Sequence, residues 1–145
     1  MLNRTIQTSL DSSDYAGLYD ILIEKENFWR QLNESIDFSF IQNEIEQNYS
    51  PTMGRPAEDP IKMFKLILLK TAYKLSDRDL IKQLRTDMQM KYFLGYAPEE
   101  TKLIDPSLLS KFRHMRLKDL NLLDMMLEKT VQLALEKKLS KLKIN

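Results

Sequence analysis

The segment from Pro106 to Lys118 carries side chains that can bind a polyanion. It contains four lysine and arginine residues, two serines, one histidine and no aspartate or glutamate. On a helical wheel most of these polar side chains lie opposite Phe112, so one face can pack while the other stays cationic. Because lysine, arginine and serine side chains all bind phosphate oxygens, the pattern suits a helix laid against a DNA backbone. A solvated cationic face is the alternative interpretation.

The predicted DNA-binding residues come from this helix and from three cations that precede it. They are Ser107, Ser110, Lys111, Arg113, His114 and Lys118, with Arg78, Arg85 and Lys91 as outer phosphate contacts. Arg116 falls on the Phe112 side of the wheel, where a guanidinium needs a carboxylate or carbonyl partner. We therefore predict a structural ion pair for Arg116.

One further arginine lies in a proline-rich stretch. The tripeptide Gly54-Arg55-Pro56 is similar to the core of short minor-groove hooks, in which an extended arginine enters AT-rich DNA. The arginine that normally precedes the glycine is replaced by Met53 here. Arg55 is a candidate DNA contact, and a plain proline-rich turn is the alternative.

Residues for catalysis or metal binding are not recognisable in the sequence. Cysteine is absent and His114 is the only histidine, so thiolate and paired-histidine metal sites are excluded. Metal-dependent phosphoryl chemistry needs carboxylates gathered around metals about 3.5 to 4 Å apart, and no such constellation is evident. We predict no catalytic residue, metal, cofactor or small-molecule substrate, and we interpret Asp77 and Asp79 as capping residues.

The charges nearly cancel but are unevenly distributed. Residues 1–59 hold four basic and eleven acidic residues, a net −7, and residues 60–145 hold eighteen and ten, a net +8. Such a chain can present its basic half to nucleic acid, and a charge-balanced helical bundle is the alternative. The first ten residues lack the apolar core of a signal peptide, and lysines interrupt the most apolar run, 63–75. We expect a cytoplasmic, nucleoid-associated protein that does not enter a membrane.

Almost the whole chain is predicted to be helical, because β-branched residues are sparse and Leu, Lys, Glu, Met and Gln dominate. The loop at 48–60 is the exception, because three prolines and a glycine interrupt helical continuation there. The segment 61–74 leaves little polar surface and is predicted to be the central core helix. The other expected helices cover residues 13–24, 28–32, 38–47, 76–87, 88–93, 105–118 and 120–142.

We predict a single, compact, all-α, multi-helix domain over residues 1–145. Its parts are an acidic helical segment (1–50), a Pro/Gly loop (51–60), a core helix with a helix-turn-helix-like trihelical unit (61–118), and a long C-terminal amphipathic helix (119–145). Ser76 and Asp105 are the expected N-caps and Gly95 the expected C-cap of helices in the basic half. Apolar residues recur at three and four spacing from Leu120 to Leu142, so this helix can pack on its own domain or form a homodimer.

Six short motifs, each common alone, form a specific combination. They are Ile36-Asp37-Phe38-Ser39-Phe40-Ile41, Gly54-Arg55-Pro56, Asp59-Pro60, Leu75-Ser76-Asp77-Arg78-Asp79-Leu80, Tyr92-Phe93-Leu94-Gly95 and Ser107-Leu108-Leu109-Ser110-Lys111-Phe112-Arg113. In this order and spacing they resemble the InsH-type N-terminal domain of bacterial insertion-sequence (DDE) transposases, from about Tyr19 to Leu139.

The resemblance implies binding of double-stranded DNA at the terminal inverted repeats of a transposon. In such transposases this region precedes a ribonuclease-H-like domain whose acidic triad binds two divalent metals. The sequence ends at Asn145, so we expect a DNA-binding fragment that is not itself an enzyme and needs no divalent metal. A subunit-pairing module and an inert remnant are the other interpretations. The family often has proline, histidine and threonine where this chain has Ile104, Pro106 and Leu108, so a threonine contact to phosphate is not carried over.

Overall fold

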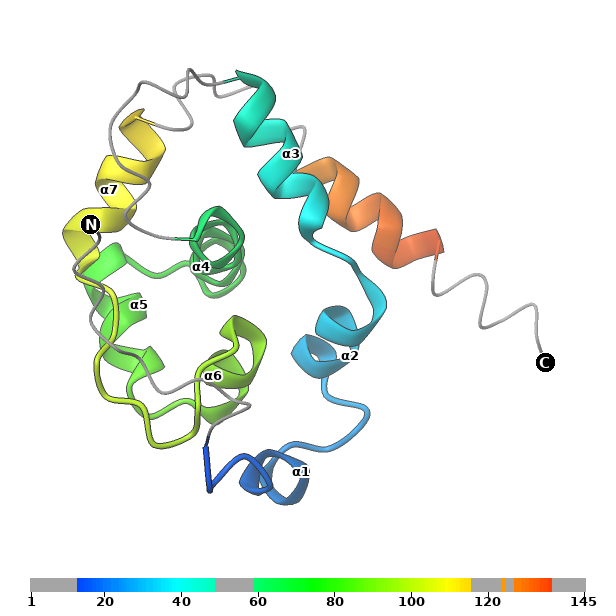
Figure 1. Cartoon of the computed structure of the whole chain (residues 1–145), viewed down its shortest axis with the longest axis vertical. Helices are drawn as coiled ribbons and strands as arrows, with labels where there is room; N and C mark the ends of the chain where they lie inside the picture. The colour runs from blue at the N-terminus through cyan, green and yellow to red at the C-terminus, as the bar shows by residue number, and fades with distance from the viewer. Residues whose placement is uncertain (1–12, 49–58, 116–123, 125–126, 137–145) are drawn as a thin grey trace.

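The computed structural model describes residues 13–48, 59–115, 124 and 127–136 (Figure 1). The regular elements in these ranges are helices, which confirms the predicted all-α class. They are α1 (Leu18–Leu22), α2 (Phe28–Ser35), α3 (Ser39–Asn48), α4 (Pro60–Tyr73), α5 (Asp77–Leu84), α6 (Met88–Leu94) and α7 (Pro106–Met115). Residues 127–136 form a further helix.

Helix α4 lies at the centre of the fold, as predicted for the apolar segment 61–74. It contacts α3, α5, α6 and α7, and α1 and α2 pack on α6. Figure 1 shows α4 end-on, with these neighbours around it. Its Phe64, Leu66 and Leu69 are fully buried. Because burying a large apolar side chain contributes about 1.5–3 kcal/mol, contacts with α4 fix the positions of α5 and α7.

The helix ends follow local capping signals. Ser76 Oγ accepts a hydrogen bond from the Asp79 amide at 3.1 Å, and the Asp105 carboxylate accepts one from the Ser107 amide at 2.8 Å. Gly95 ends α6 with φ +83°, a left-handed conformation that glycine adopts at low cost. The two predicted N-caps and the predicted C-cap are confirmed.

The first helix is shorter than predicted. α1 covers only Leu18–Leu22 instead of residues 13–24, and the residues before it form turns. The Ser13 hydroxyl donates to the Glu99 carboxylate at 2.7 Å and accepts from the Tyr15 amide at 3.0 Å. Such side-chain hydrogen bonds compete with the helical ladder, and here they hold the entry to α1 in a turn.

Arg30 connects the N-terminal helices α1 and α2 to α6. The residue is only 8% exposed. Its guanidinium donates to the Asp20 carboxylate at 2.8 Å, to the Glu34 carboxylate at 3.3 Å and to the Ile23 carbonyl at 2.7 Å. It also lies 5.6 Å from the centroid of the Tyr92 ring of α6. Arg30 therefore links α1, α2 and α6 through groups that satisfy its buried charge.

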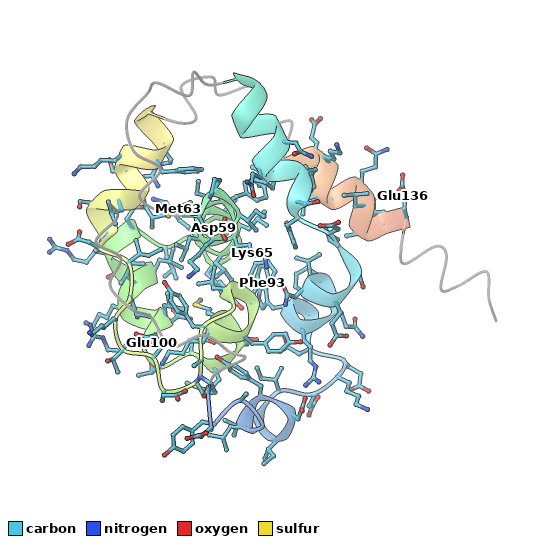
Figure 2. The ribbon with its side chains drawn as sticks, viewed as in Figure 1. Asp59, Met63, Lys65, Phe93, Glu100 and Glu136 are labelled. Carbon is cyan, nitrogen blue, oxygen red and sulfur yellow. The ribbon has the colours of Figure 1, made fainter. Side chains whose placement is uncertain are left out.

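Lys65 is a half-buried lysine that joins α4 to α2 and α6 (Figure 2). Its Nζ donates to Asn33 Oδ1 at 2.7 Å and to the Phe93 carbonyl at 3.0 Å. The same ammonium lies 4.9 Å from the ring centroids of both Phe38 and Phe93. Burial lowers the pKa of Lys65 to about 8, against a smaller opposing effect of the Asp59 carboxylate.

The lowered pKa of Lys65 predicts a pH-dependent stability. Between pH 8 and about 10.5 the unfolded chain keeps a proton on Lys65 that the folded chain has released, so this group favours folding more strongly as the pH rises. One pKa unit corresponds to about 1.4 kcal/mol, and partial exposure reduces the effect. We expect the free energy of unfolding to rise by about 2 kcal/mol relative to that of Lys65→Met between pH 7.5 and pH 10. Urea denaturation of both proteins measures this, and a constant difference would contradict it.

Candidate nucleic-acid interface

Helices α5 and α7 contact each other, and both contact α4. The inner face of α7 is the predicted one, because Leu109 is fully buried and Phe112 is 8% exposed. The outer face presents Ser107 and Lys111 to solvent, and Ser110 is half-buried between the two faces. The sequence-based assignment of the polar face of α7 is therefore confirmed for Ser107 and Lys111, whereas Ser110 is less exposed than predicted.

The start of α7 is held by its own N-cap. The pKa of Asp105 is lowered because its carboxylate accepts hydrogen bonds from Ser107, and the nearby Lys111 adds a weaker favourable interaction. A charged carboxylate at a helix N-terminus interacts favourably with the helix dipole. Lys111 is thus placed one turn inside a well-capped helix, with its side chain exposed.

Arg113 is engaged inside the protein. Its guanidinium makes two hydrogen bonds to the Asp77 carboxylate of α5, at 2.9 and 2.6 Å, and Lys70 Nζ of α4 contacts the same carboxylate at 2.8 Å. The side chains of Arg113 and Asp77 are 29% and 19% exposed. The hydrogen bond from Arg113 is the largest cause that lowers the pKa of Asp77 to about 2. Asp77 therefore joins three helices rather than serving as a cap, which corrects its interpretation from sequence.

The Asp77 network also changes the role of Arg113. Its two-point contact with a carboxylate uses the geometry that would otherwise bind a phosphate. We therefore treat Arg113 as a residue that positions α7 against α5, and no longer as a predicted direct DNA contact.

Lys91 does not reach the surface. It is 3% exposed, and its Nζ donates to the Pro98 carbonyl at 3.0 Å. Burial is the main cause that lowers its pKa, while the carboxylate of Glu100 opposes the shift. The connection from α6 to α7 thus encloses Lys91 and supplies its hydrogen-bond acceptor. Its predicted role as an outer phosphate contact is corrected to a structural one.

Helix α5 and its C-cap residue, Arg85, present a row of cations to solvent. Arg78, Lys82 and Arg85 are exposed and recur at i, i+4 and i+7, so they share one side of the helix, opposite the buried Leu80 and Leu84. We call these three residues the cationic stripe. Within the described part of the chain, no ion pair engages any of them. Figure 2 shows nitrogen-tipped side chains projecting outward from the α5 region.

Lys82 is the member of the stripe that the sequence-based prediction missed. Arg78 and Arg85 are where that prediction expected them, on the surface of α5. The missed signal was the spacing itself, because a lysine four residues after Arg78 and three before Arg85 must lie beside both on a helix. Three predicted DNA contacts have side chains that the structure does not describe, namely Arg55, His114 and Lys118. Arg116, for which an ion pair was predicted, also lies outside the described residues.

The connections between these helices differ in length. Three residues, 85–87, join α5 to α6, whereas residues 95–105 join α6 to α7. A helix-turn-helix motif joins two helices by a turn of three to four residues, and the second of them is the exposed recognition helix. Here the helix after the short turn, α6, is largely buried, and the exposed α7 follows the long connection.

Metal ligands and membrane helices are also absent from the described ranges. In residues 13–48, 59–115, 124 and 127–136, no three acidic or histidine side chains are grouped so that they could hold a metal ion. The helices in the same ranges are too short or too polar to cross a bilayer.

Comparison with known proteins identifies a family. The family described as Transposase domain (DUF772) matches residues 18–115, more than half of the chain. This range includes α1 to α7 and so contains the whole candidate interface. No curated protein and no solved structure matches the chain.

Proposed function

This chain belongs to the DUF772 transposase-domain family, and from that membership we propose that it binds duplex DNA through one surface of α5 and α7. The surface comprises the cationic stripe together with the exposed Ser107 and Lys111. In finer detail, the domain is the InsH-type N-terminal part of an insertion-sequence transposase, and its DNA is the terminal inverted repeat. Such a domain works in the cytoplasm, associated with the nucleoid.

The observation that carries this proposal is the exposed stripe on α5. Guanidinium and ammonium groups that are already paired with carboxylates gain little from a phosphate, whereas the stripe has no such partner among the described residues. Seven residues of helix span about 10 Å, so the stripe is long enough to contact more than one phosphate of a strand whose phosphates rise about 3.4 Å each along the duplex axis. Lys111 on α7 adds a fourth cation.

The mode of binding that fits this surface is contact with the DNA backbone. Lysine, arginine and serine contacts to phosphate fix the position and orientation of a protein on the duplex. Of the helix-turn-helix-like unit, only α7 is assigned to DNA contact, with its polar face toward the DNA. The proposal gives this chain no chemical step, and DNA cleavage belongs to a catalytic domain of the transposase.

A salt titration tests the proposal. With four phosphates neutralised by Arg78, Lys82, Arg85 and Lys111, the slope of log affinity against log salt concentration should be about −3.6, since each contact contributes about −0.9. Fluorescence anisotropy of labelled duplex carrying the inverted repeat of the element measures the slope between 50 and 300 mM salt. No binding at 50 mM, or a slope near zero, would contradict the proposal.

A second candidate function is subunit pairing through residues 120–142. Of this segment the structure describes residue 124 and the helix 127–136. Val131 and Leu135 are 59% and 55% exposed there, which favours pairing because an amphipathic helix gains stability when its apolar side is covered. Equilibrium sedimentation should show a homodimer, and a strict monomer at about 200 µM would contradict this second function.

A further inference from the structure

The outer face of α1 is apolar and uncovered by the described chain. Four apolar residues of α1 and of the turn before it are exposed, namely Tyr15 (55%), Leu18 (39%), Ile21 (78%) and Leu22 (57%), whereas Tyr19 among them is buried. Single exposed apolar residues are ordinary in proteins, but a contiguous group of this kind marks an interaction site. We call these four residues the α1 surface.

A surface pocket of about 580 Å³ adjoins the α1 surface. Leu22 belongs to both, and the pocket lining also includes the carboxylates of Glu24, Glu26 and Asp87. Residues 13–28 carry four carboxylates and one lysine, a net −3. The partner that suits this combination is an apolar helix face with lysines or arginines beside it.

The C-terminal helix of the same chain has those properties. Leu127, Leu133 and Ala134 pack against the core, while Val131 and Leu135 remain exposed beside them. The apolar spacing continues in the sequence beyond residue 136, and residues 127–143 hold five lysines and two glutamates, a net +3. The segment is therefore complementary to the α1 surface in both hydrophobicity and charge.

We propose that the α1 surface of one chain binds the C-terminal segment of a second copy, with Val131 and Leu135 on the apolar residues and the lysines near Glu24 and Glu26. This inference rests on the proposed pairing function and names its docking surface. Exchange of segments between two copies closes a two-fold dimer. Contact between residues 13–28 of two chains would instead bring like charges together, because this range carries a net −3.

A charge exchange tests the docking. Glu24→Lys/Glu26→Lys changes the net charge of residues 13–28 from −3 to +1, and Lys137→Glu/Lys138→Glu/Lys141→Glu changes that of residues 127–143 from +3 to −3. Each variant alone should show a dimer dissociation constant raised at least tenfold, because its surface and segment now carry like charges. An equimolar mixture should recover dimers, because each segment then meets a surface of opposite charge. Sedimentation velocity measures all three samples.

A cysteine pair checks the contact directly. The chain contains no cysteine, so introduced thiols are unique. Ile21→Cys mixed with Leu135→Cys should give several-fold more disulfide-linked dimer than Gln31→Cys mixed with Leu135→Cys, since Gln31 is exposed on α2 and does not belong to the α1 surface.

The outcomes separate the inference from the function beneath it. A wild-type chain that is monomeric at about 200 µM would overturn pairing and docking together. Dimers that form equally in the wild type and in both charge variants, or equal disulfide yields from Ile21→Cys and Gln31→Cys, would overturn the docking surface alone.

Discussion

Replacing Arg78, Lys82 and Arg85 together by glutamate is expected to weaken binding to duplex DNA by at least about 100-fold at 0.1 M salt. Each charge-assisted hydrogen bond to phosphate contributes on the order of 1 kcal/mol or more, and each new carboxylate repels the backbone. The salt slope should also lose about 2.7 of its magnitude, because three phosphate contacts disappear. Anisotropy titrations at several salt concentrations measure both effects.

The matched control for this prediction is a single pair of variants. Lys82→Glu and Lys25→Glu change the net charge equally, and both lysines are exposed, but Lys25 lies between α1 and α2. We expect Lys82→Glu to weaken binding about tenfold and Lys25→Glu to change it less than about twofold. Surface substitutions usually change stability by less than about 0.5 kcal/mol, so thermal unfolding should be nearly unaltered in both. Equal losses in the two variants would show that only net charge matters.

Replacing Asp77 by alanine is expected to be the most destabilising change at the interface. It leaves the Arg113 guanidinium and the Lys70 ammonium without their shared carboxylate, where α4, α5 and α7 pack against one another. Loss of one partner from a fully buried ion pair costs about 3–5 kcal/mol, and the partial exposure here reduces the expected loss to about 2 kcal/mol. Urea denaturation at pH 7 measures it. Asp79→Ala is the control, because Asp79 is exposed in the same helical turn and is not in the network.

The same carboxylate predicts how stability responds to acid. The pKa of Asp77 is about 2 in the folded protein, below its usual value of 3.8, so its contribution is present above about pH 4 and is lost as the pH falls toward 2. The stability advantage of the wild type over Asp77→Ala should therefore shrink in that range. A difference that stays constant from pH 5 to pH 2.5 would contradict the assigned role of the Asp77 network.

Local signals predicted much of the fold. Ser76, Gly95 and Asp105 act through hydrogen bonds or dihedral angles within a few residues, so their sequence neighbours are sufficient to predict helix ends. The apolar segment 61–74 likewise predicted a central helix, because a helix without a polar side must be covered all round. The predicted start of helix α1 was wrong, because the Ser13 hydroxyl is hydrogen-bonded to the carboxylate of Glu99, a residue 86 positions away.

The candidate site was less predictable because exposure depends on distant contacts. Lys91 and Arg113 have the side-chain chemistry of phosphate ligands, but the first is enclosed by the α6 to α7 connection and the second is bound by Asp77, 36 positions earlier. A helical wheel gives the direction of a side chain and not the neighbour that receives it. The spacing of Arg78, Lys82 and Arg85, in contrast, was readable and identifies a row that packing then left exposed.

The most direct test of the DNA-binding surface is an amide chemical-shift map of the ¹⁵N-labelled chain titrated with duplex DNA. The account predicts that the largest shifts lie in α5, in the adjoining Arg85 and in the first turns of α7 around Ser107 and Lys111, with small shifts in α1 and α2. Shifts concentrated on α1 and α2, or spread evenly over the domain, would contradict the claim that α5 and α7 form the DNA-binding surface.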